Sequence, residues 1–289
     1  MSRYPSSLWL NMFIIPALLC TAANAADLQP ETVKAWTAYT EATEQRIATE
    51  VSSPNGFLAL DFKTGTEAKD DRRALLAGKT LIEQVKTYDR RGRTMEIPEG
   101  TVHHWRGAIF VPGATLEDVL DRLRNPVPAD AEQEDVLAYK VLEKSPGQYR
   151  IYLKLQRSKI VTVVYNTEHL VRYRLHGNTR VSSSSVATKI AEVERRNNVE
   201  RELPQGHDSG FLWRMNSYWR YEQVDGGVIM ECESMTLSRS IPAVIQVMAR
   251  PLIKGVARES MQRTLETLRG RMAGLLLVRT ALQSRPMGE

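Results

Sequence analysis

The chain has 289 residues, of which 42% are hydrophobic and 25% charged, and its formal net charge is +5 at pH 7. This length suffices for one large domain or two small ones, and the weak, scattered positive charge argues against a nucleic-acid-binding protein. The sequence has no glycine-rich phosphate loop and no dinucleotide-binding fingerprint, so we expect no nucleotide chemistry.

The first 25 residues have the features of a secretory signal peptide. Arg3 makes the n-region positive, residues 8–19 form an apolar run, and residues 23–25 read Ala-Asn-Ala, the small-x-small form of a cleavage site. We therefore predict cleavage after Ala25, a mature chain that starts near Ala26, and a periplasmic or secreted protein.

The sequence has two cysteines, and only one would remain after cleavage. Cys20 leaves lipid anchoring, or retention of the leader as a membrane anchor, as alternatives, although Leu19 stands where a lipobox has a small residue. Cys232 would then be alone in the mature chain. An intramolecular disulfide is excluded, and we expect Cys232 to be a small buried residue.

Residues 26–95 are predicted to form an N-terminal helix and strand extension. The helix begins near Pro30, and the residues that recur at helical spacing along it are Val33, Trp36, Thr40, Thr43 and Ile47. Beyond it we predict a short strand at Phe57–Phe62, a charged loop, and a strand at Thr80–Thr87. We expect this helix to pack on the main domain through Trp36, Tyr39 and Ile47.

A strand followed by a short helix is predicted next. Residues 101–110 alternate, and Thr115 is a plausible N-cap for a helix over Leu116–Leu123, whose first turn is acidic. A polar loop over Asn125–Asp135 follows.

Residues 136–237 are typical of consecutive antiparallel strands joined by tight turns. Asp225-Gly226 is a strong hairpin signal between two alternating segments, and Asn197–Ser209 is a long polar insertion. The predicted strands are Val136–Lys144, Tyr149–Gln156, Lys159–Tyr165, Glu168–Leu175, Arg180–Glu194, Leu212–Gln223 and Val228–Leu237.

The last two of these strands alternate clearly between an apolar and a polar row. The apolar row of the first is Phe211, Trp213, Met215, Ser217, Trp219 and Tyr221. This pattern predicts one buried and one solvated face, so Arg214 and Arg220 are interpreted as outward salt-bridge partners. Glu231 and Glu233 point away from Met230 and are interpreted as solvated charges, not as a catalytic pair.

A long amphipathic helix is predicted to end the domain. Ser240 can cap it, and its apolar stripe is Ile241, Val244, Ile245, Met248, Leu252, Val256, Met261, Leu265, Leu268 and Met272. Pro251 removes an intrahelical hydrogen bond, and Gly255 adds backbone freedom. Two hypotheses follow: the kink gates ligand entry over Arg250–Gly255, or it only bends the helix along a curved sheet.

Three segments carry a resemblance to a known family: His103–Trp105 with Phe110–Leu116, Gly210–Arg220, and Ile241–Leu268. The chain resembles the START-like superfamily over Glu96–Arg269, and more closely its exported bacterial members. This superfamily includes steroidogenic-acute-regulatory-related lipid-transfer domains, birch-pollen-allergen-like proteins and polyketide cyclases. The resemblance implies an α+β helix-grip fold, in which a curved antiparallel sheet wraps around a long C-terminal helix. We place this domain at residues 96–273 and a tail at residues 274–289.

The resemblance also implies a cavity between sheet and helix that holds a lipid or another apolar small molecule. The expected ligand-binding residues are Trp105, Val163, Tyr173, Trp213, Met215, Trp219 and Met230, with Met248 and Leu252 as a lid. The same side chains suit a solid core equally well. Three classes of function stay open: a carrier of an apolar molecule with transient membrane contact, a cyclase- or hydrolase-like enzyme, and a cavity-free interaction module.

We expect no metal, cofactor or catalytic site. Adjacent strand residues point to opposite faces, so His103 and His104 cannot bind one metal together. Ser182–Ser185 lacks the Gly-x-Ser-x-Gly context of a nucleophile, and no histidine is expected beside it. By alternation, Lys189 is the best candidate for an inward charge that could anchor a headgroup.

Overall fold

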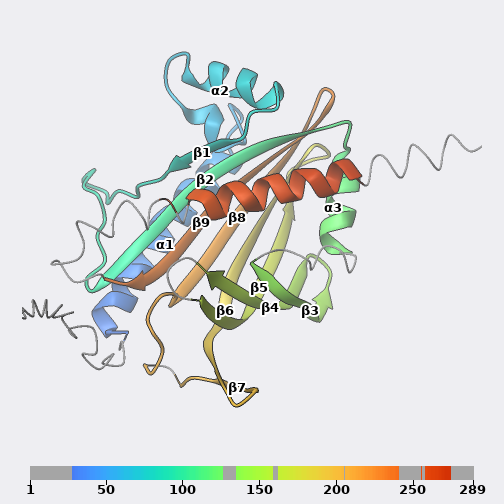
Figure 1. Cartoon of the computed structure of the whole chain (residues 1–289). Coiled ribbons are helices and arrows are strands. Elements are labelled where there is room, and N and C mark those ends of the chain that lie inside the picture. Colours follow the sequence, from blue (N-terminus) through green and yellow to red (C-terminus); the bar gives the residue numbers. More distant parts are fainter. Residues whose placement is uncertain are drawn as a thin grey trace, which may run out of the picture.

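The protein is built on one nine-stranded antiparallel sheet (Figure 1). The computed structural model describes residues 28–125, 135–158, 162–204, 206–240, 255 and 258–274. Along the sheet the strand order is β1-β2-β9-β8-β6-β5-β4-β3, and β7 pairs with β6. The bounds are β1 Leu81–Gln84, β2 Gly100–Pro112, β3 Val136–Ser145, β4 Gln148–Ser158, β5 Thr162–Leu175, β6 Arg180–Arg196, β7 Val199–Glu202, β8 Arg214–Val224 and β9 Gly227–Arg239.

Short connections explain why strands that follow one another in the sequence are paired. β8 and β9 form the hairpin predicted from Asp225-Gly226, and Gly226 adopts φ +78°, which glycine tolerates without strain. One pairing is long-range: β2 runs antiparallel to β9 along its whole length. This pairing places the first long strand beside the last one.

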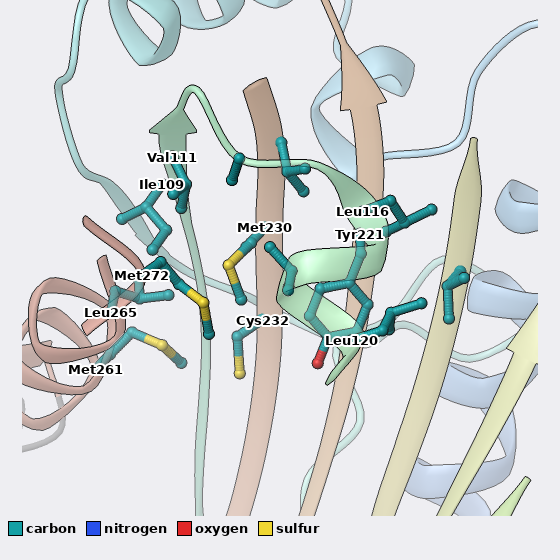
Figure 2. Packing of buried hydrophobic residues seen from close by; sticks show 14 of the residues in the cluster. Ile109, Val111, Leu116, Leu120, Tyr221, Met230, Cys232, Met261, Leu265 and Met272 are labelled. Atoms are coloured by element: carbon teal, nitrogen blue, oxygen red, sulfur yellow. The ribbon is translucent and has the colours of Figure 1, made fainter. Parts of the chain in front are cut away.

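The C-terminal helix lies across one face of the curved sheet, which we call the inner face (Figure 1). Met261, Leu265 and Met272 project from this helix toward β2 and β9, as Figure 2 shows. Gly107 of β2 permits the close approach, because a Cβ there would lie 2.5 Å from Leu265 Cδ1. This arrangement of sheet and helix is the α+β helix-grip fold that the resemblance implied.

A short helix, α3 (Leu116–Arg124), packs against the same core. The Thr115 hydroxyl accepts a hydrogen bond from the backbone N–H of Asp118 at 3.1 Å, and the Asp118 carboxylate accepts one from the backbone N–H of Thr115 at 3.1 Å. The predicted helix and its N-cap are confirmed.

Elements of the N-terminal extension cover the opposite, outer face over β2, β9 and β8. Trp36 and Tyr39 of α1 (Pro30–Val51) pack against Met235 and Leu237 of β9. The 3-10 helix η1 (Ala59–Phe62) and α2 (Glu67–Leu76) add a second cluster around the fully buried Phe57. The sheet is therefore covered on both faces here, and the predicted packing of the first helix is confirmed.

Two predictions for the extension are wrong. Phe57–Phe62 is not a strand, because the Asp61 carboxylate accepts hydrogen bonds from the backbone N–H groups of Phe57 (2.9 Å) and Leu58 (3.0 Å) and so favours η1. The charged segment that follows contains α2 instead of a loop. Glu67 and Asp70 lie in its first turn and Arg73 in the last, where they complement the helix dipole.

Two predictions for the strands also need correction. β5 continues through Asn166 and Thr167, where we expected a break, because both residues pair with β4. The polar insertion contains β7, which forms a hairpin with β6 across Asn197 and Asn198. Both asparagines have positive φ, at 48° and 63°, as a tight hairpin requires.

The signal peptide, the loop after Asn125, Met248, Leu252 and the kink at Pro251 lie outside the described residues. The predictions about them, including the gate over Arg250–Gly255, stay predictions. Within the described part of the chain, no helix has the length and apolarity to span a membrane.

Candidate functional site

The inner face carries two apolar clusters, and side chains of the C-terminal helix fill the first. Among the predicted ligand-binding residues, Trp105 and Met230 belong to this helix-covered cluster, while Tyr173 and Trp219 pack against it. Met230 is completely buried, and the helix methionines and Leu265 lie in the same cluster (Figure 2). This part of the inner face is therefore a packed core.

The second cluster, which we call the strand cluster, contains no residue of helix 258–274. Its members are the buried Leu155, Val163 and Tyr165, with Val136, Leu153, Ile190, Leu212 and Met215 packed around them. Two of the predicted ligand-binding residues, Val163 and Met215, lie here. This cluster is the part of the inner face whose described members all come from strands β3–β6 and β8 and the segment before β8.

A chain of hydrogen bonds runs along the inner face between the two clusters. The Thr167 hydroxyl donates to the carbonyl of Leu153 at 3.1 Å, so its oxygen accepts from Nε2–H of His169 at 3.0 Å. Nδ1 of His169 then carries no proton and accepts from the Ser185 hydroxyl at 3.4 Å. Burial lowers the pKa of His169 to about 4, so the imidazole is neutral at physiological pH.

The expectation that no histidine lies beside the serine run is therefore wrong. A second histidine, His176, forms a 2.8 Å hydrogen bond with Ser182. We expected a strand break at Asn166-Thr167, but β5 is continuous there. Alternation along the whole strand from Val163 to Tyr173 therefore places His169 on the inner face.

The pairing of Ser185 with His169 does not suit acid–base catalysis. A general base works best with a pKa near the working pH, and the histidine of a hydrolytic triad is oriented by a carboxylate. His169 has a pKa of about 4 and a threonine as its Nε2 partner. The arrangement favours a fixed polar anchor within an apolar surface.

A cleft of about 470 Å³ lies where β6 and β8 separate. The two strands pair only from Arg180–Val186 to Asn216–Glu222. Beyond Val186, residues 187–192 of β6 keep β5 as their neighbour on one side and line the cleft. Ile190 and Leu212 line it too, so the cleft is continuous with the strand cluster.

The predicted inward orientation of Lys189 is wrong. Thr188 is an extra residue in β6 opposite the step from Glu168 to His169 in β5, and this bulge shifts the alternation by one residue. Lys189 is exposed and pairs with Glu202 at 2.8 Å.

The expected apolar row of β8 is correct from Met215 onward but not before it. Trp213 precedes the first residue of β8 and packs with Trp36 and Tyr39 of α1, on the outer face. Trp219 packs against the helix-covered cluster of the inner face, and Phe211 is exposed. Trp213 and Trp219 therefore do not share a face.

The outer face holds a group of buried charges under α1. The Glu233 carboxylate accepts hydrogen bonds from His104 Nε2 (2.7 Å) and from Nε and Nη2 of Arg106 (3.0 and 2.8 Å), and it pairs with Arg46 of α1. Burial alone would raise the pKa of Glu233. The hydrogen bond from His104 and the positive charges of Arg106 and Arg46 instead hold that pKa far below its usual range.

Glu231 extends this group toward η1. It accepts a hydrogen bond from the backbone N–H of Ala59 at 2.9 Å and lies 3.6 Å from Nη1 of Arg220, which also pairs with Glu50 of α1. Burial raises the pKa of Glu231. The interpretation of Glu231 and Glu233 as solvated charges is wrong, because α1 and η1 cover them. Arg220 is a salt-bridge partner, as predicted, but it is buried and not exposed to solvent. The contacts of these three residues fasten the extension to the sheet.

The two adjacent histidines have separate partners. His104 lies between Tyr39 and Glu233, whereas His103 hydrogen-bonds Ser238 at 3.1 Å. Among the described residues, no group of three histidine, cysteine or acidic side chains is placed to hold a metal ion.

Comparison with known proteins finds structural neighbours. No family model and no curated protein matches the sequence. Similar solved structures include the STAR-related lipid transfer protein from Xanthomonas axonopodis, at 18% identity over 62% of this chain and 96% of that chain, with a TM-score of 0.41. The Zhui aromatase/cyclase from a Streptomyces species is 12% identical over 60% of this chain and 94% of that chain, with a TM-score of 0.38. Human STARD10 is 10% identical over 75% of this chain and 83% of that chain, with a TM-score of 0.38.

The strand order and the C-terminal helix described above give a helix-grip fold without reference to these neighbours. A likeness of such low identity and TM-score does not fix the function of this chain.

Proposed function

We propose that this is an exported protein that binds a lipid or another apolar small molecule on the inner face of its sheet. The strand cluster is the observation that carries the proposal, because it gathers apolar side chains from several strands without any residue of helix 258–274. The cleft of about 470 Å³ beside it has the volume of a small-molecule site.

The polar groups near the strand cluster also fit a binding site. Small-molecule sites combine an apolar lining with a few polar groups that fix orientation. His169 is neutral, and its tautomer is set by Thr167, so the Ser185–His169 pair offers hydrogen bonding without a buried charge. We assign Val163 and Met215 to the ligand surface, and Trp105 and Met230 to the core.

Nile red, a neutral dye that fluoresces in apolar surroundings, tests the proposal on the mature chain from Ala26. Met215→Gln places an amide in the strand cluster, and Met261→Gln makes the same change in the helix-covered cluster. We expect the first variant to bind the dye more weakly. The second should lose stability and keep dye affinity while folded.

A folded mature protein that neither binds Nile red nor retains extractable lipid would contradict the carrier and favour the interaction module. The export part of the proposal is tested separately, by N-terminal sequencing of the protein from the periplasmic or secreted fraction. We expect a chain that begins at Ala26. An intact Met1 in a membrane fraction would contradict export of a free mature protein.

A further inference from the structure

The cleft between β6 and β8 contains an arginine that has no acidic partner among the described residues. Arg214 lines this cleft and is partly buried. Its Nη1 donates a hydrogen bond to the carbonyl of the neighbouring Trp213 at 2.8 Å. Within the described residues no carboxylate pairs with it, and burial lowers its pKa. The interpretation of Arg214 as an outward salt-bridge partner is therefore wrong.

The other charged residues lining the cleft already have partners. The Glu192 carboxylate accepts a hydrogen bond from the backbone N–H of Ser209 at 2.9 Å, and Asp208 accepts one from the backbone N–H of Gly210 at 2.7 Å. Lys189 pairs with Glu202. In the described lining of the cleft, Arg214 is thus the cation that lacks an acidic partner.

A partly buried cation is costly when it is unpaired, and a planar guanidinium matches a carboxylate or phosphate group with two parallel hydrogen bonds. A bound anion would supply the missing partner. Glu192 and Asp208 also line the cleft, and their negative charges disfavour a multiply charged group there. The cleft therefore suits a single negative charge.

The cleft is also connected to an apolar surface. Leu212 and Ile190 belong both to its lining and to the strand cluster, which also contains Met215 and Val163. Arg214 points away from the inner face, because it is adjacent to the inward-facing Met215 in β8. An apolar chain attached to an anion at Arg214 would therefore pass through the gap between β6 and β8, over Leu212 and Ile190, to reach the inner face. One molecule can therefore satisfy the charge and the apolar surface together.

We propose that the ligand is an amphiphile with one anionic group, which Arg214 holds in the cleft while its apolar chain lies on the strand cluster. This inference rests on the proposed function, since it names the class of molecule that the inner face binds. The anionic group is a carboxylate or a singly charged phosphate ester, which share the same hydrogen-bonding geometry.

Displacement of Nile red by single-chain probes tests this inference. Dodecanoate and dodecanol share a chain and differ in charge, and a dodecyl phosphodiester carries the second type of anion. We expect the wild-type mature chain to bind at least one of the two anions roughly tenfold more tightly than the alcohol, as for a charge-assisted hydrogen-bonded pair. The tighter anion identifies the source of the charge.

Arg214→Gln should remove the preference for the anion and leave dodecanol affinity unchanged. Arg214→Lys keeps the positive charge but loses the planar guanidinium that forms two parallel hydrogen bonds, so it should retain part of the preference for the anion. The matched control is Arg73→Gln at an exposed position of α2, which makes the same change in net charge and should behave as wild type.

The outcomes separate the two proposals. If the wild type binds none of the probes, the proposed function fails. If it binds dodecanol and the anions equally, or if Arg214→Gln keeps the preference for the anion, the carrier stands and the role of Arg214 is refuted. Thermal unfolding of each variant shows whether a loss of affinity reflects a loss of folded protein.

Discussion

Nε2 of His104 lies 2.7 Å from Oε1 of Glu233, and both side chains are almost completely buried between α1 and the sheet. Tyr39 of α1 completes the arrangement, since its hydroxyl lies 2.8 Å from Nδ1 of the same imidazole. His104 therefore links a residue of the N-terminal extension to a carboxylate of β9. The extension is part of the same folded unit as the sheet.

Glu233→Gln should be strongly destabilising. Arg106, Arg46 and His104 would lose the carboxylate that compensates them, and breaking a buried ion pair from one side costs about 3–5 kcal/mol. Urea unfolding of the mature protein measures the change. Glu67→Gln, at an exposed position of α2, serves as the control and should change stability little. A similar small effect at Glu233 would contradict the fastening role of the charge group.

Tyr39→Phe should destabilise the protein by about 1–2 kcal/mol, because Nδ1 of the buried His104 would lose its hydrogen-bond donor. Tyr88→Phe is the matched control, since Tyr88 is exposed. The difference between the two variants in free energy of unfolding isolates the buried hydrogen bond. Equal values for both would show that Tyr39 stabilises α1 through packing alone.

Stability should fall as the pH is lowered from about 6.5 to about 4, partly because of His169. The ordinary pKa of 6.5 applies in the unfolded chain, and burial lowers the pKa to about 4 in the folded protein. Between these values the unfolded state binds a proton that the folded state does not, so this contribution is complete above pH 6.5 and is lost toward pH 4.

His169→Gln should reduce that slope without abolishing it, because burial also lowers the pKa values of His103, His104 and His176. Urea unfolding at several pH values between about 4 and 7 provides the measurement. A slope identical to that of the wild type would mean that His169 is not buried in neutral form.

Gly107→Ala should weaken the packing of the C-terminal helix and cost about 1–3 kcal/mol. The new Cβ would lie 2.5 Å from Leu265 Cδ1 and 3.1 Å from the carbonyl oxygen of Leu81, and the backbone oxygen cannot move aside easily. Gly270→Ala, in the helix itself, has open space around its Cβ and should be neutral or stabilising. Thermal unfolding of the two variants measures the difference. A higher melting temperature for Gly107→Ala than for Gly270→Ala would contradict this prediction.

Local patterns in the sequence were sufficient for much of the fold. Alternation placed Trp219, Tyr221, Met230 and Cys232 on one face, the Asp225-Gly226 pair predicted a hairpin, and Thr115 marked a helix start. The resemblance added the helix across the sheet. Each of these features depends on residues close together in the chain or on an amphipathic stripe, so the sequence alone reports them.

Long-range packing decided the rest, because alternation distinguishes two faces of a strand and does not say what covers each face. Glu233 and Arg220 have the pattern of solvated residues, yet α1, far away in the sequence, buries both. The bulge at Thr188 shifts the alternation of β6, so Lys189 points outward. The cleft beside Arg214 lies where β6 and β8 separate. The candidate site follows from where strands part and which side chains find partners, and only the tertiary structure determines both.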